Sequence, residues 1–191
     1  MICQTWISAA TVALSAILSS YALFTIGLAV FWHKARRHGS VAEFADDLSI
    51  TVIIPVRNEA ANIGALLADL DRQILPASRF EVLVMDDSST DGTAAIVQKF
   101  SSTATARIRL ISLPEVRTSA PKKRAIETAI GQAQGKLIVT TDGDCRVGPG
   151  WLHAIACCYA QTGARLISSP VTFTREAMLT DHLQTVEFAS L

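Results

Sequence analysis

A long uninterrupted run of apolar residues opens the chain. No Asp, Glu, Lys or Arg occurs before Lys34, and residues 6–32 contain only apolar and small polar side chains, with aromatic residues at both ends. About 20 such residues suffice to cross the hydrocarbon core of a bilayer, and aromatic rings favour its two interfaces. The pattern predicts one transmembrane helix over residues 6–32.

Basic residues follow the apolar run directly, at Lys34, Arg36 and Arg37. By the positive-inside rule they orient the C-terminal side toward the cytoplasm. A cleaved signal peptide is the alternative, but the run lacks a basic segment before it and is longer than the apolar part of such peptides. We therefore expect this part of the protein to cross the inner or plasma membrane once, and the number of further spans stays open. Residues 33–48 would be a juxtamembrane linker and the rest would be cytoplasmic.

From residue 49 onward, strand-like and helix-like patterns alternate. Runs rich in β-branched residues predict strands at 49–56, 80–86, 107–112, 136–142 and 165–172. Apolar residues at helical spacing predict helices at 63–74, 91–100, 121–134, 151–161 and 185–191. Alternation of this kind is typical of an α/β fold, a mostly parallel sheet with helices on both faces.

Composition narrows the classes of protein that fit this pattern. The chain has 191 residues, of which 17 are Lys or Arg and 17 are Asp or Glu. That length suits one domain plus a short extra element, and the balanced charge argues against a nucleic-acid partner. The four cysteines form no CxxC pair, so we expect reduced thiols in the cytoplasm. No glycine-rich phosphate loop of the GxGxxG or GxxxxGK[ST] kind occurs.

Polar clusters follow three of the predicted strands. Ligands of parallel sheets bind beyond the carboxyl ends of the strands, so these clusters are candidate site residues. They contain five carboxylates, namely Glu59, Asp86, Asp87, Asp142 and Asp144. Five like charges on one edge repel one another, so a divalent metal ion or basic side chains must offset them.

Two motifs could supply that offset. In extended chain, side chains at i and i+2 point the same way, so Asp142 and Asp144 could bind Mg²⁺ or Mn²⁺, which take one or two carboxylates and leave positions for phosphate. A polar turn is the alternative for this Asp-Gly-Asp segment. The basic run 122–124 opens a predicted helix, where three cations oppose the helix dipole and so indicate a nearby anion.

Taken in order, these segments resemble a known enzyme family. Residues 52–63, 82–93 and 121–145, with the Gly-Trp-Leu at 150–152, are similar to family-2 glycosyltransferases, in particular to membrane-bound polysaccharide-building members. The resemblance covers residues 49–191. It implies a Rossmann-like GT-A domain that binds a nucleotide-diphosphate sugar, usually UDP- or GDP-linked. It also implies transfer of the sugar, with inversion, to a saccharide or lipid-linked acceptor at the cytoplasmic membrane face.

The resemblance also implies roles for single positions. The nucleoside pocket would be lined by Pro55, Arg57 and Glu59, and Asp87 would hold the base or ribose. Lys122 would lie near the nucleotide. Asp142 and Asp144 would form the DxD pair that binds the nucleotide-sugar and Mg²⁺ or Mn²⁺, with Asp144 the stronger metal ligand. The family has an Ala-Leu-Asn segment where this chain has Ala-Ile-Glu at 125–127, which leaves the sugar preference open.

One expected feature is missing from the sequence. Family members carry a catalytic-base carboxylate well downstream of DxD, and Glu176, Asp181 and Glu187 are too close to serve as it. We therefore expect the base beyond Leu191, in a longer protein of which this chain is an N-terminal fragment, inactive by itself. Two alternatives remain, a nucleotidyltransferase of similar fold and a non-catalytic, membrane-anchored nucleotide-binding module. The first should show a glycine-rich basic loop after the first strand, where this chain has Arg-Asn-Glu-Ala.

Overall fold

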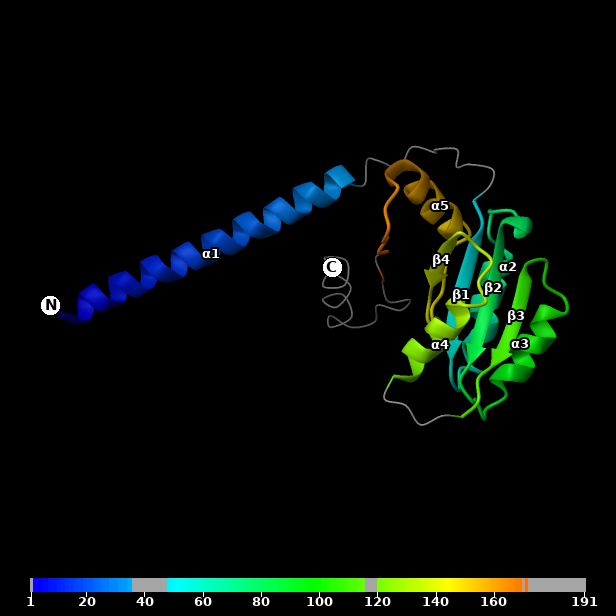
Figure 1. Ribbon diagram of the computed structural model, residues 1–191. Coiled ribbons are helices and arrows are strands. Elements are labelled where there is room, and N and C mark those ends of the chain that lie inside the picture. The colour runs from blue at the N-terminus through cyan, green and yellow to red at the C-terminus, as the bar shows by residue number, and fades with distance from the viewer. Residues whose placement is uncertain (1, 36–47, 116–119, 170, 172–191) are drawn as a thin grey trace. The chain divides into compact units, whose positions relative to one another are not determined.

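The chain forms two units in a computed structural model that describes residues 2–35, 48–115, 120–169 and 171 (Figure 1). Unit 1 comprises residues 1–41 and 169–191, and unit 2 comprises residues 42–168. Most of the predicted linker 33–48 and the whole predicted helix 185–191 lie outside the described residues.

Unit 1 contains a single long helix among its described residues, α1 (Ile2–Ala35). Its segment Thr11–Phe31 has 21 residues, which at 1.5 Å per residue spans about 32 Å, against roughly 30 Å for a bilayer core. The Ser15 hydroxyl donates to the Thr11 carbonyl at 2.8 Å, and the Thr25 hydroxyl to the Ala22 carbonyl at 2.9 Å, so neither needs a water partner. Length and composition thus allow α1 to cross a membrane once, although a signal sequence meets the same criteria.

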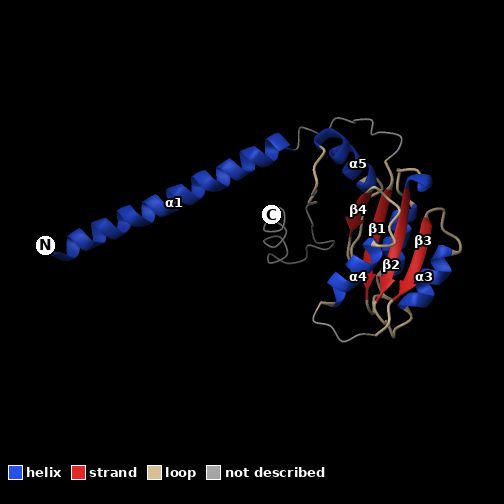
Figure 2. Cartoon of the chain, viewed as in Figure 1, coloured by secondary structure: helices blue, strands red, loops and turns tan. Residues whose placement is uncertain are grey.

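Unit 2 is built on a four-stranded parallel sheet (Figure 2). The strands are β1 (Ile50–Val56), β2 (Phe80–Asp86), β3 (Arg107–Ser112) and β4 (Leu137–Thr140), in the order β3-β2-β1-β4. Val56 lies opposite Asp86 in the register. The chain therefore leaves β1 and β2 at the same level, and the loops that follow these strands are neighbours.

Helices cover both faces of this sheet. The helices are α2 (Ile63–Asp71), α3 (Thr93–Ser101), α4 (Pro121–Ile130) and α5 (Trp151–Thr162), with a short 3₁₀ turn η2 (Ala77–Arg79). Buried side chains of α2, α3 and α5 share one core with Val52 and Ile54 of β1. Ala125 and Ala129 of α4 share the other core with Ile53. Because successive strand residues face opposite sides, β1 is buried on both faces, which confirms the α/β prediction and explains its continuous apolar run.

Three predicted elements differ from the structure. The helix predicted over 63–74 ends at Asp71, and Ile74 is 63% exposed. The strand expected at 165–172 is absent from its described residues, 165–169 and 171. Leu166 is 87% exposed there, whereas Ile167 packs partly against the core. The helix predicted over 121–134 ends instead at Ile130. Residues 134 and 135 donate their N–H groups to Glu81 and Thr51 rather than to a helical turn, so the chain is drawn against the start of β1.

Candidate functional site

The candidate site lies at the carboxyl edge of the sheet, in the loops after β1, β2 and β4. Backbone hydrogen bonds extend the ladder into these loops: the Asp87 N–H donates to the Val56 carbonyl at 2.9 Å, and the Thr141 N–H donates to the Ile53 carbonyl at 3.2 Å. The first residues of these loops are therefore held in place by the sheet. All seven predicted site residues, Pro55, Arg57, Glu59, Asp87, Lys122, Asp142 and Asp144, lie in β1, in these loops or in the first turn of α4.

The loops after β1 and β2 are joined through Asn58. Its backbone has φ of 58°, the left-handed region that Asn tolerates better than most residues. Its side-chain oxygen accepts from the Thr90 N–H at 2.8 Å, and its own N–H donates to the Ser89 hydroxyl at 2.9 Å. The two loops thus form one unit.

A second link runs through Asp91 and Thr93. The Asp91 carboxylate accepts from the Ala60 N–H at 2.9 Å and from the Thr93 hydroxyl at 2.6 Å, while the buried Thr93 hydroxyl accepts from the Glu59 N–H at 2.9 Å. The Thr93 hydroxyl, and next the Ala60 N–H, lower the pKa of Asp91 below its usual value. The cap residue of α3 is Gly92, with φ of 91°, so the helix begins two residues later than the predicted start at 91. Asp91 instead accepts from the Thr93 N–H inside the helix.

Asp87 is a buried carboxylate, 7% exposed, with a guanidinium at each oxygen. Arg124 donates to its Oδ1, and Arg57 lies 3.8 Å from its Oδ2. Arg124 also donates to the Pro114 carbonyl at 3.1 Å. A buried carboxylate needs such partners because an unpaired charge is costly away from water.

Basic side chains in the first turn of α4 offset part of the negative charge of the site, as the sequence predicted. Lys122 Nζ lies 2.5 Å from Asp142 Oδ1, and Arg124 pairs with Asp87. Lys123 points to solvent and pairs only loosely with Glu127, at 3.7 Å. The anions that the basic run predicted are therefore, in part, the protein's own carboxylates.

Asp142 and Asp144 are both exposed, with buried Gly143 between them. A Cβ on Gly143 would lie 2.9 Å from Val56 Cγ1 and 3.1 Å from Glu59 Cγ, so glycine lets this loop pack against the loop after β1. Across the described part of the chain, no group of three or more His, Cys, Asp or Glu gathers as a complete metal cage. Two exposed carboxylates nevertheless fit Mg²⁺ or Mn²⁺, which bind through one or two carboxylates plus phosphate oxygens.

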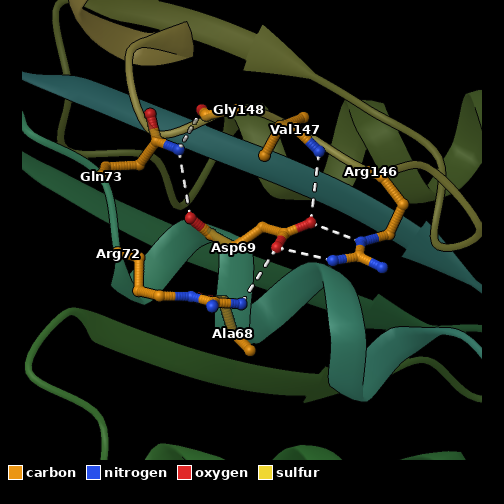
Figure 3. Close-up of polar contacts among 7 residues, drawn as sticks. All are labelled: Ala68, Asp69, Arg72, Gln73, Arg146, Val147 and Gly148. Atoms are coloured by element: carbon orange, nitrogen blue, oxygen red, sulfur yellow. Dashed lines mark hydrogen bonds and ion pairs between the residues drawn. The ribbon is translucent and has the colours of Figure 1, made fainter.

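Sequence reasoning missed Asp69, which holds the loop that follows Asp144 (Figure 3). This α2 carboxylate is 8% exposed and accepts from Arg146 Nε at 2.5 Å and Arg146 Nη2 at 2.9 Å. The Arg146 hydrogen bond lowers the pKa of Asp69, against the opposing effect of burial. The partners are 77 positions apart. An acidic residue among the apolar positions of α2 was the only signal in the sequence.

This architecture is that of a GT-A-type domain, a parallel sheet with paired acidic and basic residues at its carboxyl edge. The sequence model of glycosyl transferase family 2 matches residues 51–178. The chain therefore belongs to this family, as its motifs predicted.

Relatives and solved structures agree with this assignment. Glycosyltransferase AglE of Haloferax volcanii is 38% identical over 125 residues, which cover 65% of this chain and 40% of that protein. The mannosyltransferase PcManGT of Pyrobaculum calidifontis, solved with GDP-Man and Mn²⁺, matches with a TM-score of 0.56 and 29% identity, over 83% of this chain and 46% of that one. TarS 1–349 of S. aureus, solved with UDP-GlcNAc, matches with a TM-score of 0.53 and 25% identity, over 68% of this chain and 39% of that one. This chain thus spans less than half the length of each.

Proposed function

We propose that this chain is the donor-binding part of a membrane-anchored, inverting glycosyltransferase. It would bind a nucleotide-diphosphate sugar, whose sugar is transferred to a saccharide or lipid-linked acceptor at the cytoplasmic membrane face. The observation that carries the proposal is the meeting of Arg57, Asp87 and the Lys122–Asp142 pair at one edge of a family-2 sheet. The solved relatives with GDP-Man and UDP-GlcNAc support the class of donor.

The two sides of the site suit the two ends of such a donor. Asp87 is a buried carboxylate, and its oxygens accept hydrogen bonds, which suits a base N–H or ribose hydroxyl. Pro55, Arg57 and Glu59 would line this nucleoside pocket from the end of β1. Lys122 would move its ammonium from Asp142 to a diphosphate oxygen, exchanging one charged hydrogen bond for another.

Asp142 and Asp144 would hold the Mg²⁺ or Mn²⁺ ion, with Asp144 the stronger ligand. Of the two, Asp144 is the carboxylate without a cation beside it among the described residues. When bound, the ion would stabilise the negative charge of the departing diphosphate. Lys122 would add a second positive charge at the same oxygens. A base on a part of the protein beyond Leu191 would deprotonate the acceptor hydroxyl.

The anchoring role belongs to α1. Its 21-residue apolar segment is long enough for one span, and the basic residues after it favour the cytoplasmic side for unit 2. Nucleotide-sugars would then reach the site from the cytoplasm, and a lipid-linked acceptor would reach it from the membrane.

The test is nucleotide binding by the full chain in detergent. UDP and GDP are titrated calorimetrically with Mn²⁺ and with EDTA, for the wild type, Asp144→Ala and Glu115→Ala. Glu115 is an exposed carboxylate after β3, at the same edge of the sheet, so its variant matches the change in charge. We expect one nucleotide to bind in a Mn²⁺-dependent manner, a loss of about 10-fold or more in Asp144→Ala, and little change in Glu115→Ala.

Other outcomes distinguish the alternatives. Absent or metal-independent binding by the wild type would contradict the transferase and favour a module of another function. An equal loss in both variants would mean that general electrostatics, and not a metal ligand, governs binding.

A further inference from the structure

The segment 141–150 contains no helix or strand, although it carries Asp142 and Asp144. At its start it is tied to the sheet through the Thr141 N–H and the Ile53 carbonyl, at 3.2 Å. Ligands for a metal must be held in place before the metal binds, or the binding free energy is spent on ordering them. The question is therefore what fixes the far end of this segment.

The C-terminal turn of α2 fixes it, through side chains and backbone together (Figure 3). The Asp69 carboxylate accepts two hydrogen bonds from the planar fork of Arg146 and a longer one, 3.4 Å, from the Val147 N–H. Such a bidentate pair fixes orientation as well as distance. Arg146 is two residues after Asp144, so a fixed guanidinium restricts the backbone that carries Asp144.

Gln73 extends the same attachment. Its side-chain nitrogen donates to the Gly148 carbonyl at 2.8 Å, and its side-chain oxygen accepts from the Leu152 N–H at 3.0 Å. The Ile74 N–H donates to the Pro149 carbonyl at 2.9 Å. Asp69 in the last turn of α2, and Gln73 and Ile74 just after it, thus hold the stretch from residue 146 to the start of α5.

The burial of Asp69 argues that this contact is more than a surface ion pair. Its side chain is 9% exposed, whereas those of Arg146 and Arg72 are 49% and 69% exposed. An exposed pair contributes little, but a buried carboxylate with a forked donor has one favourable geometry. Arg72, which caps the C-terminus of α2, meets the same carboxylate at 3.2 Å, so it satisfies Asp69 without touching the loop.

We infer that Asp69 and Arg146 are positioning residues for the metal ligand Asp144, an inference that rests on the proposed function. Asp69 holds Arg146, and Arg146 sets the path of the chain between β4 and α5. Neither residue contacts the nucleotide or the metal. Their loss weakens metal-dependent binding and leaves the nucleoside contacts at Arg57 and Asp87 intact.

The experiment compares Asp69→Asn, Arg146→Gln and Arg72→Ala in the full chain in detergent. Arg146→Gln guards against a folding defect, because Arg146 is on the surface, and Arg72→Ala removes the partner of Asp69 that does not touch the loop. Free Mn²⁺ is measured by electron paramagnetic resonance in the presence of UDP or GDP, and nucleotide affinity is measured separately in EDTA. We expect a roughly 10-fold weaker Mn²⁺ affinity for Asp69→Asn and Arg146→Gln, with Arg72→Ala and all EDTA affinities within about twofold of the wild type.

Each other result overturns the inference. Unchanged Mn²⁺ affinity in folded Asp69→Asn and Arg146→Gln would mean that the contact is structural only. Equal losses with Mn²⁺ and in EDTA, or a loss as large in Arg72→Ala, would mean general damage to the domain. A wild type without Mn²⁺-dependent nucleotide binding would overturn the proposed function first, and the positioning role with it.

Discussion

Replacing Gly135 by alanine should destabilise unit 2 severely, although the residue is far from the candidate site. A Cβ at this position would lie 2.4 Å from the Thr51 nitrogen and 2.6 Å from the Ile50 carbonyl carbon. Ordinary contacts begin at about 3.4 Å, so about 1 Å of movement is needed. The obstacle is the backbone of β1, which is paired with β2 on one side and β4 on the other, and it cannot give way as a side chain could.

The magnitude follows from two contributions. Overpacking a dense interior costs about 1–3 kcal/mol, and the rigid obstacle puts this site near the upper end. Moving residue 135 away would also stretch its 2.8 Å hydrogen bond to the Thr51 hydroxyl, a further loss of about 1 kcal/mol. A total of about 4 kcal/mol corresponds to a decrease of roughly 16 °C in Tm for a domain of this size.

Differential scanning calorimetry of the full chain in detergent measures this decrease. Gly64→Ala is the matched control, because its added Cβ would meet only Ile96 Cγ2, at an ordinary 3.6 Å. Gly64 lies in α2, where alanine is favoured over glycine by up to about 1 kcal/mol, so this variant should melt at or above the wild-type temperature. A Gly135→Ala protein that melts within about 2 °C of the wild type would refute the close approach of residue 135 to β1.

Three further changes test the site. The Arg146 hydrogen bond lowers the pKa of Asp69, so the ionised Asp69 stabilises the fold fully above its unfolded pKa of about 3.9, and this stabilisation is lost as pH falls through the lower folded pKa. Between pH 5 and 2, the free energy of unfolding measured by chemical denaturation should therefore decline less in Asp69→Asn than in the wild type. An equal decline in the two proteins would contradict this. Gly143→Ala should displace Val56 and Glu59, weakening nucleotide affinity in EDTA several-fold and costing about 1–3 kcal/mol in denaturation. Unchanged affinity would mean that Glu59 is not a contact. Thr93→Val should lower the free energy of unfolding by about 1–3 kcal/mol, because it leaves the Glu59 N–H without its acceptor, whereas Thr93→Ser keeps the hydroxyl and should lower it less. Equal stability of these two variants in chemical denaturation would show that the hydroxyl contributes nothing.

The sequence predicted the fold where apolar periodicity alone decides it. The run through Val52, Ile53 and Ile54 predicted a strand covered on both faces, and all three side chains are fully buried. The edge chemistry was predictable for a related reason. The carboxyl ends of parallel strands meet at one edge, so the acidic residues after β1, β2 and β4 had to be neighbours.

The features that sequence could not predict depend on long-range contacts. A run such as 165–169 has strand-like composition, but it has no strand partner among the described residues, and Ile167 packs only partly against the core. A glycine such as Gly135 is typical of the end of a helix. Here, however, glycine is needed because the chain passes too close to Thr51 for any side chain to fit. The Asp69–Arg146 pair joins α2 to a loop that follows the fourth strand, and no local pattern contains that information.

The basic residues of α4 have one consequence for how this edge can change. Lys122 and Arg124 belong to a single helical turn, but their partners, Asp142 and Asp87, follow strands that lie on opposite sides of β1. A shift of that turn away from the sheet would lengthen both ion pairs in one movement. The two halves of the edge are thus linked through one short piece of backbone, and such a shift cannot lengthen one ion pair without lengthening the other.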